Sequence, residues 1–339
     1  MLLRTGLIPP GARCLAAVSG GSDSTALLLL LAQAAPELNL SLTAAHVNHN
    51  LRPQAQADAD FVAELCAKLG VPIRVLSANV RHRARELKIS LEEAGRWERY
   101  NFFLKLKKEL NIDLIVTAHT ADDQAETVLM RLISGAGTAG LAGIRTLRDG
   151  VARPLLRCTK AELQQFLKDE GQSWREDGTN HIPSAPRTAV RLNILPEIKK
   201  LNPSAVKAIA RLADSAREDE DYFQTEAVKF WQRSLVKPPF PSSSETAFPR
   251  AALRALPPPI RKRFWSLLYR RASGGGNEDA PFSLGGALES CHYAALENFL
   301  FLDNEKRLNL PGGRNRIYSR GSQKPSPFRK LPQLCLSCL

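Results

Sequence analysis

The sequence has few cysteines and no long apolar run, and these two absences narrow the class of protein. The 6 cysteines among 339 residues are scattered along the chain, so no disulfide framework is expected and a reducing cytoplasm is the predicted location. The apolar run 26–31 is too short to cross a bilayer, and no apolar core of signal-peptide length follows Met1. We therefore expect a cytoplasmic protein without a membrane role.

Acidic residues are also scarce relative to basic ones. The chain has 34 Asp and Glu against 47 Lys and Arg, which gives a formal net charge of +13 at pH 7. Such a surplus favours binding to a polyanion, most commonly nucleic acid, although charge spread evenly for solubility is an alternative. No acidic residue follows Glu305, where 8 Lys or Arg occur, so residues 311–339 are expected to form a basic, flexible tail.

Apolar, strand-like runs alternate with helical stretches over roughly the first third of the chain. The expected strands are 14–18, 40–47, 71–76 and 112–118, and the expected helices are 25–33, 54–69 and 90–110. This alternation predicts an α/β fold: a Rossmann-like parallel sheet with helices on both faces, whose ligands gather at the carboxyl ends of the strands. A smaller, mostly helical domain is expected over 201–310, with linkers or loops at 237–245 and 256–259.

Residues 19–24, Ser-Gly-Gly-Ser-Asp-Ser, lie between the first expected strand and its helix. A glycine turn at a helix start collects backbone N–H groups and the positive end of the helix dipole, which together hold phosphate. The loop contains no lysine, so it is not a Walker A loop. Its carboxylate, Asp23, is a candidate Mg²⁺ ligand beside the phosphates. An ordinary serine-rich turn that opens a helix is the alternative.

Three further clusters carry polar side chains that fit a nucleotide site. His46 and Asn48 close the second strand, and Arg96 and Arg99 share one face of the helix 90–110. The segment 117–127 places four polar residues on one helix face, at a spacing of 0, +3, +4 and +7: His119, Asp122, Asp123 and Glu126. These carboxylates fit Mg²⁺ or the ammonium of an amine substrate, but acidic residues also favour helix N-termini for structural reasons. Residues 135–140 match G-x-G-x-x-G but end a helix, so they predict a flexible loop instead of a Rossmann turn.

Residues 19–24 resemble the Ser-Gly-Gly-x-Asp-Ser signature of the PP-loop, or N-type, ATP pyrophosphatases. Taken in order, the motifs between about residues 12 and 200 resemble those of bacterial tRNA(Ile)-lysidine synthases. The matching segments are 46–52, 96–100, 118–127, 135–144, 153–156 and 174–180. The chain departs from that pattern at Thr188, where the family usually has Asn in Arg-Asn-x-x-Arg, and its last residues do not resemble the further small domain of longer members.

The resemblance implies that ATP adenylates the C2 oxygen of the wobble cytidine in tRNA(Ile) with a CAU anticodon. The ε-amine of free L-lysine then displaces AMP and leaves lysidine. ATP is a substrate, and Mg²⁺ is expected at Asp23. No organic cofactor is expected, and the sequence leaves open whether the protein forms a homodimer. The expected ATP-binding residues are Ser19, Gly20, Gly21, Ser22, Asp23, Ser24, His46, Asn48 and His119. The expected catalytic residues are Asp23, Arg96, Asp122, Asp123 and Glu126, and the expected tRNA-binding residues are Arg191, Arg261, Lys262 and Arg263.

Several assignments stay open at this point. Arg99 and Arg153, like Arg96 and Arg191, are candidates to hold phosphates or the tRNA backbone, and which carboxylate contacts lysine or metal is undetermined. A PP-loop tRNA thiolase is one alternative function, but it would have Lys at the position of Ser22 and paired Cys-x-x-Cys motifs in mid-chain. The sequence has one such pair, at Cys335 and Cys338. A non-catalytic RNA-binding protein that keeps the nucleotide fold is the other alternative.

Overall fold

A computed structural model describes residues 6–51, 54–175, 186–235, 246–272, 288, 290–301, 307–309, 315–320 and 333–338. The chain forms two compact units, residues 1–217 and 218–339. The boundary lies inside the helix α10 (Ala205–Ser234), whereas the sequence predicts a boundary at residue 200. This helix begins after Ser204 and continues through the point where one unit ends.

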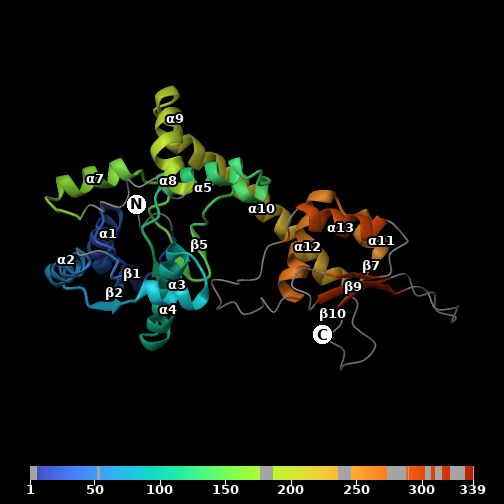
Figure 1. The fold of residues 1–339 in the computed structure, drawn as a ribbon, viewed down its shortest axis with the longest axis horizontal. Coiled ribbons are helices and arrows are strands. Elements are labelled where there is room, and N and C mark those ends of the chain that lie inside the picture. Colours follow the sequence, from blue (N-terminus) through green and yellow to red (C-terminus); the bar gives the residue numbers. More distant parts are fainter. Residues whose placement is uncertain are drawn as a thin grey trace. The chain divides into compact units, whose positions relative to one another are not determined.

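The first unit is built on a six-stranded sheet in the order β3-β2-β1-β4-β6-β5 (Figure 1). The strands are β1 (Arg13–Ala17), β2 (Ser41–Asn48), β3 (Ile73–Ser77), β4 (Leu114–Val116), β5 (Leu147–Arg148) and β6 (Val151–Ala152). Pairing is parallel throughout except between β5 and β6. The strand order reverses on either side of β1, so the loops after β1 and β4 diverge and leave a place for a ligand at the carboxyl edge. This confirms the predicted parallel α/β fold.

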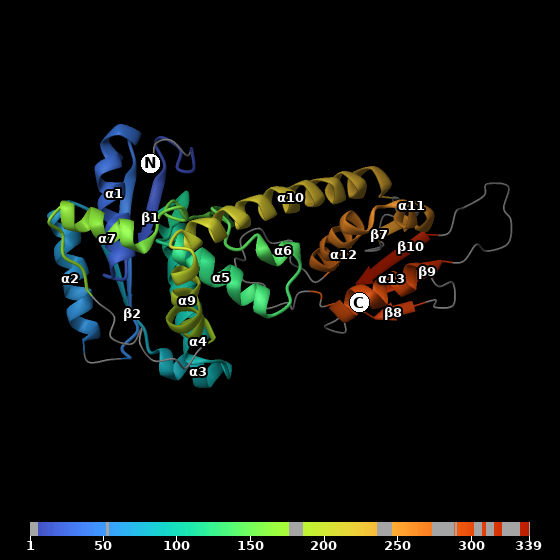
Figure 2. The ribbon, with the colours of Figure 1, turned by 90° about the horizontal axis from the view of Figure 1, so that it is seen from above.

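Helices cover both faces of this sheet (Figure 2). On one face lie α1 (Ser22–Leu38), α2 (Ala55–Lys68) and α7 (Lys160–Asp169), which enclose the side chains of Cys14 and Ala16. On the other face α4 (Leu91–Glu109) packs against the alternate residue Leu15 through Phe103 and other apolar side chains. Successive residues of β1 therefore point into two separate cores, as expected for a buried parallel strand.

The remaining helices of the first unit differ in part from the sequence prediction. They are α3 (Val80–Leu87), α5 (Ala121–Ile133), α6 (Thr138–Leu141), α8 (Pro186–Ala189), the π-helix η3 (Val190–Ile194) and α9 (Leu195–Leu201). The segment 135–140 is not wholly a loop, because α6 begins inside it. Arg52, the residues 176–180 of one family-like motif and the predicted linker 237–245 lie outside the described residues.

The second unit contains helices and an antiparallel sheet. Its helices besides the end of α10 are α11 (Arg250–Ala255), α12 (Pro258–Ala272) and α13 (Ser290–Phe301). Its sheet has the order β7-β10-β9-β8, formed by Thr246–Pro249, Gln333–Cys338, Asn315–Arg320 and Arg307–Asn309. Two strands thus lie within 311–339, where the sequence predicts a flexible tail. Residues 258 and 259 open α12 and do not form a linker, because proline suits the first helical turn.

None of the described helices combines the length and apolar character that crossing a membrane requires. Cys14, Cys66, Cys158 and Cys291 are not joined in disulfides. Burial raises the pKa of the Cys14 and Cys66 thiols to about 11, so these two groups act as apolar core side chains.

Candidate active site

The loop between β1 and α1 is shaped by hydrogen bonds among its own residues. The backbone N–H of Ser19 donates to Ser24 Oγ over 3.1 Å, and Ser24 Oγ in turn donates to the Gly21 carbonyl over 3.1 Å. Gly21 is the N-cap of α1, and it has no side chain that could accept a hydrogen bond from the first N–H groups of the helix. The serines therefore fix the loop, and its backbone N–H groups are what an anion would meet.

Gly20 has the backbone geometry that only glycine adopts readily, with φ of +90°. A Cβ built at this position would lie 3.3 Å from Cγ2 of Val62 on α2. The Gly20 carbonyl also accepts a hydrogen bond of 2.9 Å from the N–H of Arg175, whose side chain forms an ion pair with Asp58 of α2 at 3.1 Å. The loop is thus enclosed between α2 and the segment that ends at Arg175.

Asp23 lies in the first turn of α1 and carries an unusual carboxyl group. Burial raises the pKa of Asp23 to about 6; Lys160 opposes this shift, and Asp122 and Asp123 add to it. Within the described ranges no group of three or more His, Cys, Asp or Glu side chains could hold a metal ion. Mg²⁺ is commonly held by one or two carboxylates together with substrate phosphates, so Asp23 fits a Mg²⁺ that arrives with ATP.

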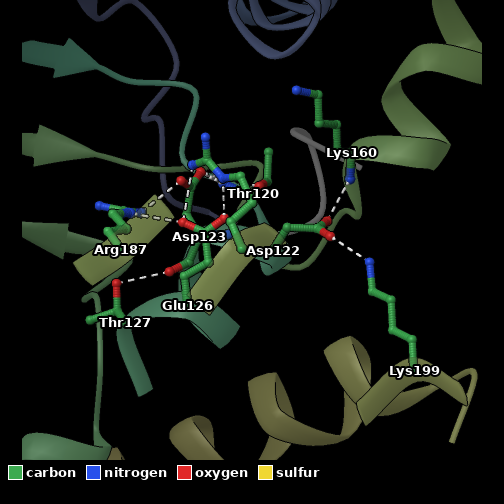
Figure 3. A network of polar contacts seen from close by, with 9 residues as sticks. Thr120, Asp122, Asp123, Glu126, Thr127, Lys160, Arg187 and Lys199 are labelled. Atoms are coloured by element: carbon green, nitrogen blue, oxygen red, sulfur yellow. Dashed lines mark hydrogen bonds and ion pairs between the residues drawn. The ribbon is translucent and has the colours of Figure 1, made fainter. Parts of the chain in front are cut away.

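The helix α5 begins after β4 and carries two of the predicted carboxylates in an ion-pair network (Figure 3). Arg187 Nη2 lies 2.8 Å from Asp123 Oδ1, and Arg187 Nε lies 2.8 Å from Glu126 Oε2. Arg191 Nε lies 2.6 Å from Glu126 Oε1. Glu126 is 2% exposed, so its charge is compensated by these two arginines and not by water.

Asp123 also satisfies the structural alternative that the sequence leaves open. Its Oδ2 accepts a hydrogen bond of 2.9 Å from the N–H of Thr120, and the Thr120 hydroxyl caps the N–H of Asp123, which is a complete capping box. One carboxylate oxygen therefore caps α5 while the other pairs with Arg187. The capping interpretation is therefore confirmed, and binding of metal or amine by Asp123 stays a prediction.

Asp122 points to a different set of partners (Figure 3). Its Oδ2 accepts the backbone N–H of Lys160 at 2.8 Å, and its Oδ1 pairs with Lys199 Nζ at 3.2 Å. This side chain therefore ties α5 to the start of α7 and to α9. The four residues at the helical spacing therefore have different contacts, and a catalytic role for Asp122 stays a prediction.

The polar residues at the strand ends make short contacts to nearby groups. His46 Nδ1 lies 2.9 Å from the Val18 carbonyl, Asn48 Oδ1 accepts the N–H of Asn50 at 2.9 Å, and His119 Nδ1 lies 2.9 Å from the Thr117 hydroxyl. Burial lowers the pKa of His46, and it lowers the pKa of His119 to about 4. Both imidazoles are therefore neutral near pH 7.

The predicted arginines Arg96 and Arg191 have different contacts, because Arg191 pairs with Glu126 and Arg96 stacks on an aromatic ring. Arg96 lies over the ring of Tyr100, with its Cζ 5.2 Å from the ring centroid. Arg187, Lys160 and Lys199 were not among the predicted site residues. Arg187 and Arg191 are four residues apart, so both lie on one side of a helix. From this spacing the sequence could have predicted that they bind the same carboxylate.

Arg261 and Arg263 are not surface residues open to tRNA, contrary to the sequence prediction. Arg261 is buried and forms an ion pair of 2.6 Å with Glu297, and Arg263 Nε donates to Glu220 Oε2 over 3.0 Å. Lys262 between them is exposed, with its Nζ 4.8 Å from the ring of Tyr293. Of the three predicted tRNA-binding residues on α12, Lys262 alone carries an exposed charge.

The chain is similar to known proteins, and its family match lies within the first unit. Residues 7–198 match the PP-loop domain family. A relative from Clostridium perfringens named tRNA(Ile)-lysidine synthase is 38% identical over 68% of this chain and 50% of its own length. One of the same name from Thermus thermophilus is 38% identical over 73% of this chain and 46% of its own length. The chain therefore spans about half the length of these curated relatives.

Among solved structures, the chain is similar to a U34-tRNA thiolase from Methanococcus maripaludis with its 4Fe–4S cluster. The TM-score is 0.52 at 19% identity, over 63% of this chain and 75% of the other, which is a likeness of fold. The family match covers residues 7–198 of 339, and it includes the loop 19–24 and the carboxylates of α5. The chain therefore belongs to the PP-loop domain family.

Proposed function

We propose that the chain ligates free L-lysine to C2 of the wobble cytidine of tRNA(Ile) with a CAU anticodon, using ATP and forming lysidine. The observation that carries this proposal is the neighbouring placement of the loop 19–24 after β1 and the carboxylates of α5 after β4. One edge of the sheet thus offers both a phosphate site and an amine site. The names of the relatives support the same assignment.

In the first step the C2 oxygen of cytidine attacks the α-phosphorus of ATP. The new C2–O–P bond forms as the bond from the α-phosphorus to the bridging oxygen breaks, and pyrophosphate leaves with the electron pair. The backbone N–H groups at the start of α1 stabilise the charge that develops on the leaving group. Mg²⁺, when held by Asp23 and the phosphates, would neutralise part of this charge.

In the second step the ε-amine of lysine attacks C2, the C2–O bond breaks, AMP leaves with the electron pair of that bond, and the proton that the amine loses passes to water. Asp123 and Glu126 are proposed to orient this amine, because they are the carboxylates that already hold cationic groups at the strand edge. Arg187 must then share these oxygens with the substrate.

We also propose that residues 1–200 carry the catalysis and that residues 201–310 contribute to tRNA binding, with 311–339 adding positive charge. The exposed cations Lys262, Arg270 and Arg271 of α12 support the second role. Binding through them would be sequence-independent and sensitive to salt. The reaction is placed in the cytoplasm, in keeping with the free thiols at the described cysteines.

The test uses isotopically labelled lysine with the full chain, ATP, Mg²⁺ and tRNA(Ile) bearing CAU. Label in the tRNA that depends on ATP, with AMP released in equal amount, is expected. A tRNA with uridine in place of the wobble cytidine is the matched control and takes up no label. RNA-dependent AMP release without lysine transfer, or sulfur transfer in its place, would favour a thiolase. RNA binding without any AMP would favour a non-catalytic protein.

A further inference from the structure

Three arginines on the α4 side of the sheet edge lie close to one another. Arg96 and Arg99 are on α4, and Arg153 directly follows β6. Arg96 lies over the ring of Tyr100. Tyr100 also interacts with Arg153, where its charge and a side-chain hydrogen bond oppose the larger effect of desolvation on the pKa of Arg153. Tyr100 therefore contacts both Arg96 and Arg153. The charge of Arg96 lowers the pKa of both Arg99 and Arg153, after the larger effect of desolvation, which places the three cations in one electrostatic group.

Arg99 and Arg153 differ from the other site arginines in what they contact. Arg99 Nη2 lies 3.4 Å from Nε2 of His49, and Arg153 Nη1 donates to the carbonyls of Arg145 and Val151 at 3.0 and 3.2 Å. Within the described residues neither forms an ion pair with a carboxylate. Arg187 and Arg191, by contrast, form ion pairs with Asp123 and Glu126.

A further observation concerns Arg153 itself. Its Nε atom is buried and has no hydrogen-bond partner among the described residues. Leaving a guanidinium N–H unpaired is costly, and two neighbouring cations add repulsion. The Arg99 side chain is exposed although surrounding atoms desolvate its guanidinium. Arg99 and Arg153 thus carry positive charge that forms no ion pair within the described residues, and the Arg99 side chain is open to solvent, so an anion would satisfy both.

We propose that Arg96, Arg99 and Arg153 bind a phosphodiester group of the RNA substrate, next to the nucleotide that is modified. This assignment rests on the proposed function. It places ATP and RNA on opposite sides of the sheet edge, because α1 and the loop 19–24 lie on one face and α4 lies on the other. The nucleotide between them would reach both the α-phosphorus and the carboxylates of α5.

The charge of the group favours a phosphodiester over the other anions of the reaction. The polyphosphate of ATP already has the N–H groups of α1 and a candidate Mg²⁺ ligand in Asp23. Free lysine brings a carboxylate, but its α-ammonium would enter the same cluster of cations and be repelled. A phosphodiester carries one negative charge with no attached cation, and arginine binds it with two parallel hydrogen bonds.

The test compares three variants of the full chain: Arg99→Gln, Arg99→Lys and Arg85→Gln. Arg85 is an exposed arginine of α3, so its variant removes the same charge outside the group. The probe is an anticodon stem–loop RNA with a CAU anticodon, titrated at several salt concentrations. For Arg99→Gln the Kd is expected to rise about tenfold, and the slope of log K against log salt to fall in magnitude by about 0.7.

Arg99→Lys is expected to restore the salt slope but only part of the affinity, because lysine keeps the charge and loses the paired hydrogen bonds. Arg85→Gln is expected to bind as the wild type does. The affinity for ATP and the KM for lysine should stay unchanged in all three variants. A rise in the KM for lysine, or in the Kd for ATP, with normal RNA binding would overturn the proposal, as would an equal loss in Arg85→Gln.

The RNA titration needs no catalysis, so its result separates the two proposals. If the wild type transfers no lysine but Arg99→Gln loses affinity and salt slope, the phosphodiester site stands and the proposed function fails. If lysine is transferred and Arg99→Gln binds RNA normally with an unchanged slope, the proposed function stands and the site is wrong.

Discussion

Arg187 donates a hydrogen bond of 2.8 Å to Glu126, a residue 61 positions earlier in the chain. This contact fixes α8 against α5 and compensates a carboxylate that is almost fully buried. Any cationic substrate that approaches Glu126 therefore meets a site already neutralised by arginine. In the proposed mechanism the ε-amine of lysine therefore shares the carboxylate oxygens with Arg187.

Removing the charge of Glu126 should destabilise the first unit. In Glu126→Gln the two arginines lose their shared carboxylate, and because they are partly exposed we expect the free energy of unfolding to fall by about 2 kcal/mol. Glu197→Gln, which removes a pair with Lys200 at the surface, should cost less than about 0.5 kcal/mol. Urea denaturation of both variants measures the difference, and equal stability of the two would contradict the role given to Glu126.

A side chain at Gly20 should disturb the loop before any ligand binds. Gly20→Ala combines a φ of +90° with the contact to Val62, and we expect a loss of about 1–2 kcal/mol together with weakened ATP binding. Gly70→Ala is the matched control, because Gly70 also has a positive φ, +67°, but nothing lies within 4 Å of its added Cβ. The control should keep normal ATP affinity. Nucleotide titration and thermal unfolding of the two proteins test this, and a control as impaired as Gly20→Ala would refute the account.

Stability should fall on acidification because of His49. Burial, with help from Arg99 and His46, lowers the pKa of this imidazole from 6.5 to about 4. Below pH 6.5 the unfolded chain takes up a proton that folded His49 does not accept until about pH 4, so stability is lost as the pH falls through this window.

The expected loss attributable to His49 at pH 5 is about 1–2 kcal/mol. His49→Asn should lose correspondingly less stability than the wild type between neutral pH and pH 5. Urea unfolding of both proteins at both pH values provides the comparison, and parallel losses in the two would disprove the assignment.

Substitutions at two neighbouring residues of α12 should have different effects, one on the stability of the second unit and the other on tRNA binding. Arg261 pairs with Glu297, which also accepts the indole N–H of Trp265 at 2.9 Å, so Arg261→Ala should destabilise the second unit by about 3 kcal/mol. Lys262→Ala should leave stability within about 0.5 kcal/mol of the wild type and weaken tRNA binding with a smaller salt slope. If Lys262→Ala binds tRNA normally, the exposed face of α12 has no part in recognition.

The sequence predicts those features that depend on local signals. The loop 19–24 and the strands on either side of α1 are set by an apolar run, two glycines and a helix start, all within a short stretch. The capping box of Thr120 and Asp123 is equally local. The helix α3 was not predicted, because Val80 and Ala84 are its only described buried residues and its helical state depends on packing against α4.

Other features depend on contacts between distant residues and could not be predicted. The pairing of Arg187 with Glu126 requires the fold to bring α8 to α5. The basic run at 261–263 predicts a binding surface when the sequence is considered alone. In the structure Arg261 and Arg263 instead form ion pairs with Glu297 and Glu220, which are distant in the sequence. The strands within 311–339 likewise form by pairing with β7 and β8, which precede them in the chain.

The central claim is that the loop 19–24 directs cleavage of ATP between its α and β phosphates, with Asp23 in the reacting site. The most direct measurement is the identity of the products from ATP, Mg²⁺, lysine and tRNA(Ile) with CAU, for the wild type and for Asp23→Asn. We expect AMP and pyrophosphate in equal amounts from the wild type, a rate lower by about a hundredfold in Asp23→Asn, and the same tRNA affinity in both. Release of ADP and phosphate by the wild type, or equal rates in the two proteins, would contradict the account.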